Sequence, residues 1–476
     1  MPNKLIINSL YYTLGKMLPM AVSFIMVPIY TRYLLPAEYG ILNSMQVLST
    51  IFLIIFTLSI ETSLFRLYYD YKDETKRRLF IGSAFILIFV STTVGTTFLF
   101  LFRSTIEKIY TNIPFAPYYI LAILIMYFTI FSIVPRIIFV ITERGKLYFL
   151  TGLLQLLVSL ILNIIYIIIL DQKAIGALKA LLLTNLIMLP VYTYYQFKYS
   201  KLMLNLNMAK AILTFSLPLL PASLSTWIIN SSNRIFIDRY FSQSEVGVFS
   251  LGFRITFVYI VLITSIRLAY NPQYFRLANS PDQSRAKQKL YVYNHYYLVF
   301  SIIASFVISF FAKEVVGIFL NDRYYDAWII LALLTYANMF LESSAIYRMS
   351  LSQKKATIVI AVIVLCTGVI NLILNWIFIS RWGMYGAAEA TLFSGILLYG
   401  TFNLASKKYG YHIQAKYFKL FILLLTGLVI NFLFWQIPVS LISSFIIKIT
   451  LVALCTLFIY WKFGDMIRSL IFEFKK

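Results

Sequence analysis

Residues 28–40 read PIYTRYLLPAEYG and join one apolar stretch to the next. The core of this segment, RYLLPAEYG at residues 32–40, recurs 207 positions later as RYFSQSEVG at residues 239–247. Pro36 and Gly40 favour a helix that ends and then restarts. Glu38 and Glu245 would each lie near the start of the following helix, where the helix dipole stabilises a carboxylate. We therefore predict a structural corner between two helices at each copy.

Three further matches occur in the same order at nearly the same offset. Residues 176–180 read GALKA and residues 386–390 read GAAEA, while Asn163 matches Asn375. Basic turns at residues 144–146 and 353–355 also correspond. Self-similarity of this kind indicates an internal repeat. The sequence predicts an N-terminal bundle at residues 1–205, a C-terminal bundle at 206–410, and an addition at 411–476 that lies outside the repeat.

The chain is too apolar for a water-soluble protein. Of 476 residues, 61% are hydrophobic and 12% are charged, against about 45–50% and about 25% in ordinary soluble domains. We predict an all-α polytopic membrane protein with about 14 transmembrane helices. The predicted spans are 8–30, 40–65, 80–102, 118–141, 149–170, 176–197, 211–231, 246–268, 291–312, 327–348, 356–379, 384–405, 416–436 and 439–461. Six spans in each half make the repeats parallel, which is a transporter architecture.

The formal net charge of +23 first suggests a polyanionic partner such as a nucleic acid. With the N-terminus taken as cytoplasmic, however, the inner segments hold 27 Lys and Arg residues and the outer segments hold nine. The positive-inside rule then predicts a multi-pass protein of the inner (plasma) membrane with both termini in the cytoplasm. Most of the charge is attracted to membrane lipids, and no basic domain is left to bind nucleic acid.

Five basic residues remain inside the predicted spans: Lys16, Arg136, Lys179, Arg254 and Lys448. A charge at the bilayer centre costs several kcal/mol, so it usually faces a wet cavity or a partner. The acids inside the spans are fewer: Glu61, Glu342 and Glu389. This excess of cations favours an anionic cargo. The alternatives are that Arg136 and Arg254 only hold helices together, and that Lys179 and Lys448 snorkel from span ends.

Residues 28–40, the segment SLPLLP at 216–221, and the GAxxA starts of spans six and twelve carry a family resemblance. The sequence resembles the polysaccharide transporter family, the Wzx-type oligosaccharide flippases of the MOP flippase superfamily. The resemblance implies two six-helix bundles in a V around a central cavity. The implied cargo is an undecaprenyl-diphosphate-linked oligosaccharide for O-antigen, capsule or related surface polysaccharides, with a polysaccharide polymerase as a candidate partner. A lipid II flippase and a MATE-type antiporter remain alternatives.

This resemblance gives the intramembrane polar residues candidate roles. Arg136 in span four and Arg254 in span eight would bind the diphosphate from the two halves, with Lys179 as a further cation. Lys16 lies where related lipid II flippases carry a basic residue. The candidate contacts to sugar hydroxyls are Gln155, Asn163, Asn230, Asn371 and Asn375. Such amides also form interhelical hydrogen bonds worth about 0.6 kcal/mol each, and this alternative stays open.

The sequence shows no pattern of a catalytic centre. The chain has two histidines, neither in a zinc-ligand spacing, and it has no GxxxxGK[ST] phosphate loop. We therefore predict no enzymatic activity, no metal and no cofactor. Transport would then draw on the membrane potential, an ion gradient, or consumption of the cargo on the outer face.

Overall fold

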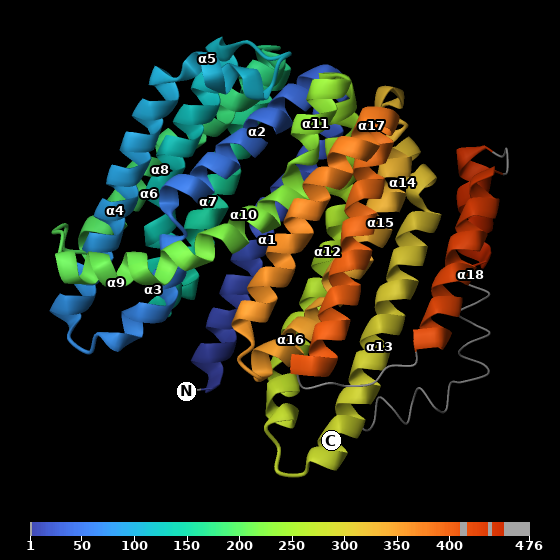
Figure 1. Ribbon diagram of the computed structural model, residues 1–476. Helices are drawn as coiled ribbons and strands as arrows, with labels where there is room; N and C mark the ends of the chain where they lie inside the picture. Colours follow the sequence, from blue (N-terminus) through green and yellow to red (C-terminus); the bar gives the residue numbers. More distant parts are fainter. Residues whose placement is uncertain (1, 410–416, 437–439, 452–476) are drawn as a thin grey trace.

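The computed structural model describes residues 2–409, 417–436 and 440–451, except for the side chains of 2–10, 16, 19–23, 269, 417 and 418 (Figure 1). Within these residues all regular elements are helical. The α-helices are α1 (Pro2–Tyr33), α2 (Pro36–Thr57), α3 (Ile60–Leu67), α4 (Glu74–Leu101), α5 (Arg103–Ile106), α6 (Ile120–Ile141), α7 (Gly145–Asn163), α8 (Lys173–Tyr199), α9 (Leu206–Ser216), α10 (Leu220–Ser231), α11 (Asn233–Tyr240), α12 (Gln243–Ala278), α13 (Gln283–Phe310), α14 (Ala312–Phe319), α15 (Ala327–Ser343), α16 (Ala345–Gln353), α17 (Thr357–Tyr409) and α18 (Tyr417–Gln436). A shorter apolar helix runs over Leu441–Leu451.

Eleven helices in the described part of the chain are long and apolar enough to cross a membrane. One of them, α17, has 53 residues and contains predicted spans eleven and twelve, which meet at a break at Gly383 (φ 54°, ψ −133°). Helix α1 covers predicted span one, and the helix at Leu441–Leu451 begins span fourteen, whose remainder lies outside the described residues. The prediction of an all-α polytopic membrane protein is confirmed.

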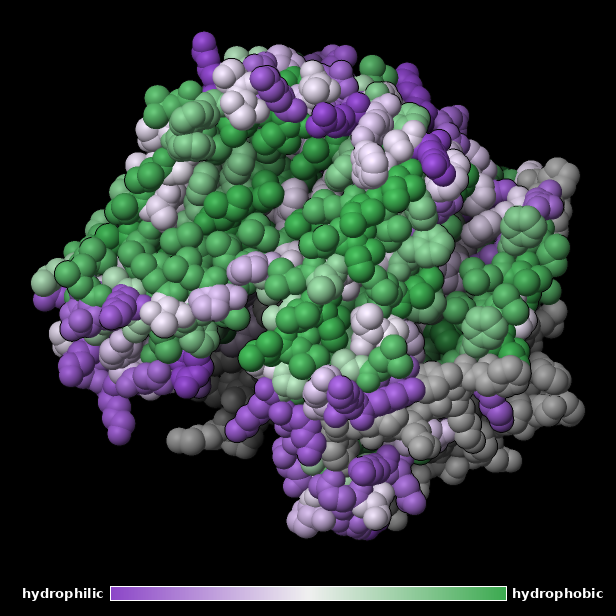
Figure 2. Space-filling view, viewed as in Figure 1, coloured by the Kyte–Doolittle hydropathy of each residue, from purple (hydrophilic) through white to green (hydrophobic). Residues whose placement is uncertain are grey.

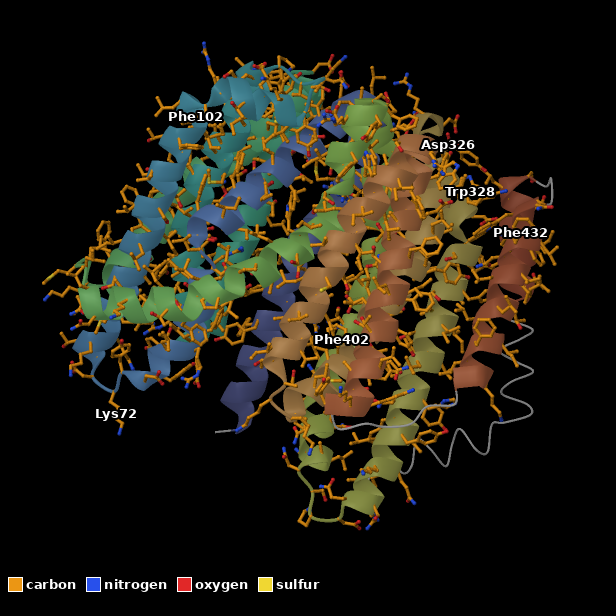
Figure 3. All side chains as sticks on the ribbon, in the orientation of Figure 1. Lys72, Phe102, Asp326, Trp328, Phe402 and Phe432 are labelled. Atoms are coloured by element: carbon orange, nitrogen blue, oxygen red, sulfur yellow. The ribbon has the colours of Figure 1, made fainter. Side chains whose placement is uncertain are left out.

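The surface agrees with this fold. A broad apolar band crosses the middle of the molecule, and polar residues gather at the two ends (Figure 2). Lys72, from a predicted inner loop, lies at one end of the molecule, whereas Phe102 and Asp326 lie at the other (Figure 3). The predicted inner and outer loops therefore separate to opposite ends. Which end faces the cytoplasm stays a prediction of the positive-inside rule, and we call the two ends inner and outer on that basis.

The helices form two groups, with α4, α6 and α8 in one and α13, α15 and α17 in the other (Figure 1). Predicted span seven crosses between the groups, because α9 packs against α3 and α4 whereas α10 packs against α17. Pro218 and Pro221 lie at the turn between α9 and α10, where a missing backbone N–H permits the bend. The predicted boundary between the bundles, after residue 205, assigns α9 to the second bundle, but α9 packs against the first group of helices. The boundaries of the two halves stay predictions.

The two copies of the repeated segment form the predicted corners. Helix α1 ends at Tyr33 and α2 begins at Pro36, and the Glu38 carboxylate accepts a hydrogen bond from the Leu35 N–H at 2.8 Å. This bond caps the start of α2. In the second copy, the Ser242 hydroxyl accepts from the N–H of Glu245 at 3.3 Å and caps α12.

The two corners pack directly against each other. A β-carbon on Gly40 would lie 1.9 Å from the carbonyl oxygen of Gln243, and one on Gly247 would lie 1.9 Å from the carbonyl oxygen of Pro36. Positions 36 and 243 correspond in the repeat, as do positions 40 and 247. The contact is therefore pseudo-two-fold, and the missing side chains let α2 and α12 meet backbone to backbone. The Ser44 hydroxyl donates to Gln243 Oε1 at 3.1 Å across the same contact.

The repeated glutamates make a second pair of equivalent contacts. Glu38 lies 3.5 Å from the Nζ of Lys173, the first residue of α8. Glu245 accepts a hydrogen bond at 2.9 Å from the N–H of Met384, the residue after the break in α17. Each glutamate thus fixes the start of the sixth span of its own half to the corner.

We expect Gly40→Ala and Gly247→Ala each to lower the free energy of unfolding by about 1–3 kcal/mol, since the added methyl overpacks the α2–α12 contact. Thermal unfolding of the purified protein in detergent measures this change. The matched control is Gly400→Ala, because no atom lies within 4 Å of a β-carbon at Gly400. Equal melting temperatures for the Gly40 and Gly400 variants would show that the close contact contributes nothing.

Candidate functional site between the two halves

Arg254 lies where α1, α2 and α12 meet. Its guanidinium carbon is 5.9 Å from the ring centre of Tyr30 and 5.5 Å from that of Tyr39. Aromatic faces attract a guanidinium but do not neutralise it. Among the residues that the structure describes, no carboxylate or carbonyl pairs with Arg254. Within the described residues, the junction of the two helix groups therefore holds a cation without an acidic partner.

Asn163 fixes one of these rings. The Tyr30 hydroxyl donates to Asn163 Oδ1 at 3.0 Å, and both side chains are buried. The amide nitrogen of Asn163 donates in turn to the carbonyl of Ser159 at 2.7 Å. A chain of contacts thus runs from span five through Tyr30 to Arg254. In this state the Asn163 side chain makes the interhelical hydrogen bond that the sequence left as an alternative.

Arg234 of α11 is a second cation in this part of the molecule. It is buried, donates to the Asn233 side chain at 3.0 Å, and lies over the rings of Phe249 and Phe253 at 5.1 and 4.5 Å. The charges of Arg234 and Arg254 act on each other. The sequence analysis did not identify Arg234 as a candidate site residue, because its polar neighbours place it in a predicted outer segment.

Arg136 of α6 lies inside the first group of helices. Its guanidinium carbon is 5.8 Å from the Tyr148 ring centre, and its buried Nε has no hydrogen-bond partner in the structure. Tyr192 faces this guanidinium and donates to Gln155 Oε1 at 2.9 Å. The structure therefore brings Gln155 and Arg136 together. No described contact joins Arg136 to Arg254, so the two arginines do not form one cluster.

The two arginines also differ in depth. Arg254 is eleven residues from Gln243 at the outer start of α12, which is roughly 16 Å along a helix. Arg136 is sixteen residues from Ile120 at the outer start of α6, which is roughly 24 Å. The inner end of the molecule is thus nearer to Arg136, and the outer end is nearer to Arg254.

The other amides predicted to contact sugar make bonds within the protein. Asn375 Nδ2 donates to Asn371 Oδ1 at 3.0 Å and to the Ser232 hydroxyl at 3.1 Å, which ties α17 to the end of α10. Asn371 Nδ2 donates to the Ser394 hydroxyl at 2.9 Å. The Asn230 amide donates to a carbonyl one turn earlier in α10. Contacts from these amides to sugar stay a proposal.

The remaining lysines differ in their surroundings. Lys179 donates to Gln172 Oε1 at 2.9 Å near the outer start of α8. The side chain of Lys16 in α1 lies outside the described residues. Lys448 is 1% exposed and pairs with Glu314, which is 0% exposed, at 2.9 Å. Its Nζ also donates to the Phe310 carbonyl at 2.6 Å. Lys448 does not snorkel: it pins the helix at Leu441–Leu451 to α13 and α14.

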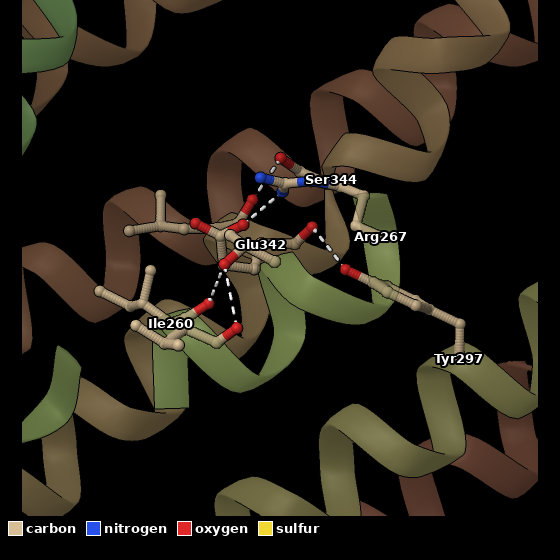
Figure 4. Close-up of polar contacts among 8 residues, drawn as sticks. Ile260, Arg267, Tyr297, Glu342 and Ser344 are labelled. Atoms are coloured by element: carbon tan, nitrogen blue, oxygen red, sulfur yellow. Dashed lines mark hydrogen bonds and ion pairs between the residues drawn. The ribbon is translucent and has the colours of Figure 1, made fainter. Parts of the chain in front are cut away.

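A second ion pair, between Glu342 and Arg267, gives one of the predicted intramembrane acids a positively charged partner. Glu342 of α15 pairs with Arg267 of α12, and the Tyr297 hydroxyl donates to the Glu342 carbonyl at 3.4 Å (Figure 4). Both charged side chains are about four-fifths covered. The pair joins three helices of the second group to one another.

The outer end above Arg254 is closed. The Tyr324 hydroxyl donates to the Leu34 carbonyl at 3.0 Å, and the Tyr324 ring lies edge-on to Tyr39. The buried Asp238 carboxylate joins the corner at α11 to a loop of the first group, because it accepts from the N–H of Thr111 at 3.0 Å and from Asn112 at 3.2 Å. Burial raises the pKa of the Asp238 carboxyl, and these hydrogen bonds oppose that shift.

The inner end is different. The surface is hollowed between the two groups of helices near the lower, inner end (Figure 2). The α2–α12 crossing and the Tyr324 contact close the outer end, whereas this recess separates the groups at the inner end.

Residues 5–278 match the family model described as polysaccharide biosynthesis protein. The chain belongs to this family. Residues 218–377 also match the MatE family model. No curated protein matches the sequence. The resemblance that the repeated segment suggested is therefore confirmed at the level of the family.

Solved transporters share the fold of this polysaccharide biosynthesis family protein. The lipid II flippase MurJ in an inward closed conformation matches with a TM-score of 0.75 at 16% identity, over 97% of this chain and 100% of that one. An inward-facing multidrug resistance MATE transporter of the MOP superfamily matches with a TM-score of 0.62 at 15% identity, over 87% and 98% of the two chains. A mutant of the Vibrio cholerae MATE transporter VcmN matches with a TM-score of 0.55 at 14% identity, over 85% and 96%. The protein is thus an integral membrane protein with the fold of MOP-superfamily flippases and transporters.

We expect Asp238→Asn to lower the free energy of unfolding by about 1–3 kcal/mol, since an amide NH₂ would face N–H donors that now share a carboxylate. The midpoint of heat denaturation in detergent reports the loss. Asp322→Asn is the control, because that carboxylate is exposed at the same end. If both substitutions shift the midpoint equally, Asp238 does not join the two halves.

Proposed function

We propose that this protein is a flippase that moves an undecaprenyl-diphosphate-linked oligosaccharide from the cytoplasmic to the outer leaflet by alternating access. The observation that carries the proposal is Arg254, an unpaired guanidinium at the junction of the two halves. A diphosphate cannot cross lipid bare, and a guanidinium binds phosphate oxygens with paired hydrogen bonds. Membership of the polysaccharide biosynthesis family and the fold shared with a lipid II flippase support a lipid-linked glycan as cargo.

The depths of the two free arginines suggest an order of contacts. The diphosphate enters the recess at the inner end and meets Arg136 first. It then moves outward to Arg254, where Arg234 adds a second positive charge. Lys16 and Lys179 are further candidate cations, and Gln155, Asn163, Asn230 and Asn375 are candidate sugar contacts. These amides would exchange a helix contact for a sugar hydroxyl when the halves move.

Release requires the outer contacts to part. The two predicted bundles, residues 1–205 and 206–410, would rock about the cargo until the α2–α12 crossing, the Tyr324 contact and the Asp238 contact separate. The helix at Leu441–Leu451 would move with the second bundle, since the Lys448–Glu314 pair joins it to α14. A polymerase on the outer side would consume the delivered glycan. Both termini would remain in the cytoplasm.

A lipid II flippase is the second candidate, because the structural similarity to MurJ extends over 97% of this chain. The lipid that accumulates after depletion of the protein separates the two. A lipid-linked repeat unit of a surface polysaccharide supports the first function, and lipid II supports the second. A cation-coupled MATE-type exchange is less favoured, because the cation at the junction has no carboxylate partner among the described residues.

We expect Arg254→Ala to lower transport about 10–100-fold, which is the effect of losing a charged hydrogen bond of about 1.5–3 kcal/mol. Arg254→Lys should retain more activity than Arg254→Ala, because it keeps the charge. Surface glycan per molecule of membrane-inserted protein is the measurement. Arg381→Ala, at an exposed arginine, should leave the glycan normal. Full activity of Arg254→Ala would remove this residue from the site.

Arg136→Ala should reduce glycan export by a similar factor while the protein stays in the membrane, since the first contact with the diphosphate would be lost. A flipping assay in proteoliposomes with a fluorescent undecaprenyl-diphosphate oligosaccharide measures the rate. Tyr192→Phe is the companion variant, because it keeps the ring beside Arg136 and the arginine itself, and removes the hydroxyl that bonds to Gln155. Unchanged rates for Arg136→Ala would contradict an inner diphosphate contact.

A further inference from the structure

A cleft of about 600 Å³ opens at the outer end of the molecule. Its walls come from the end of α1, from the π-helix η4 (Ile164–Ile169) after α7, and from the end of α14 with the two residues before η6 (Asp322–Tyr324). The residues that carry its chemistry are Ile29, Arg32, Tyr33, Ile168, Phe319 and Asn321. Arg254 does not line this cleft, which is therefore separate from the proposed transport site.

The walls of the cleft combine polar and apolar surface, and exposed apolar side chains lie along its rim. Ile318 and Phe319 are 57% and 54% exposed, and Ile169, beside the wall residue Ile168, is 69% exposed. Apolar side chains exposed together at a membrane boundary suit acyl chains better than water. The apolar rim of the cleft could therefore bind the acyl chains of an amphiphile.

Arg32 supplies a positive charge for the headgroup of such an amphiphile. It lines the cleft and is exposed, and no described carboxylate, carbonyl or ring pairs with it. No aspartate or glutamate occurs among the described residues that line the cleft. One guanidinium matches the single negative charge of a phosphodiester, and the lack of a carboxylate leaves nothing to bind the ammonium of a zwitterionic headgroup.

The position of the cleft links it to the closed state. Residues 28–33 and Ile168 belong to the predicted first half, whereas residues 318–321 belong to the second. Tyr324, three residues beyond Asn321, makes the hydrogen bond to Leu34 that closes the outer end. A molecule in the cleft would therefore touch both halves beside their seal.

We propose that this cleft binds an anionic glycerophospholipid of the outer leaflet, with the phosphate on Arg32 and the acyl chains along the apolar rim. The bound lipid holds the two halves together at the outer end and so favours the closed state. The repeat provides a comparison within the same molecule. Arg239 corresponds to Arg32 and is also exposed, but it does not line the cleft.

Native mass spectrometry of the purified full chain, titrated with phosphatidylglycerol or phosphatidylcholine, tests the proposal. Phosphatidylglycerol should bind the native chain and Arg239→Gln with equal affinity, and Arg32→Gln about tenfold more weakly. Phosphatidylcholine should bind weakly and respond to neither substitution. Inorganic phosphate should not compete at millimolar concentration, because it lacks the acyl chains.

Ile318→Asp provides a second variant that leaves Arg32 in place. It puts a negative charge on an exposed part of the wall, so it should weaken phosphatidylglycerol binding without unfolding the protein. Bound phosphatidylglycerol should also raise the melting temperature of the native chain, and this rise should be lost in Arg32→Gln. Equal phosphatidylglycerol affinity for Arg32→Gln and Arg239→Gln would overturn the proposal. Equal affinity of the native chain for both lipids would overturn it as well.

Discussion

The contact between two glycines and two backbone carbonyls at the outer end is the constraint on which the site depends. Gly40 and Gly247 leave no side chain between α2 and α12, so the helices meet at the shortest distance that backbones allow. This closeness brings Tyr39, next to Gly40, over Arg254, which lies two turns further along α12 than Gly247. The same repeated segment thus joins the halves and places the rings that surround the cation.

The cost of burying a charge explains why some intramembrane cations hold helices together and others do not. An isolated charge in a low-dielectric interior is costly unless it is paired or hydrated. Lys448 and Arg267 have carboxylate partners and therefore hold helices together. Arg254 and Arg136 have aromatic neighbours but no described acid, so their charges remain available. Lys448 therefore has a structural role, and the prediction that it snorkels from a span end is wrong.

Much of the fold could be predicted because it depends on local properties of the chain. A transmembrane span can be predicted from the hydropathy of about 20 consecutive residues. The repeated glycines and glutamates indicate the corners directly. Contacts between residues that are far apart in the chain produce no such pattern in the sequence. Lys448 and Glu314 are 134 positions apart, Tyr30 and Asn163 are 133 apart, and neither pair shows a pattern. The burial of Arg234 could not be predicted for the same reason, since it depends on Phe249 and Phe253 of the following helix.

The buried Lys448–Glu314 pair has a consequence for the order of assembly. Helices insert in chain order, so Glu314 reaches its place beside α13 before Lys448 has been synthesised. Until then its carboxylate lacks its counter-charge, and separating a pair buried this deeply costs about 3–5 kcal/mol. The helix at Leu441–Leu451 then covers Glu314 and neutralises it, so an element that follows the predicted repeat completes the ion pair on α14.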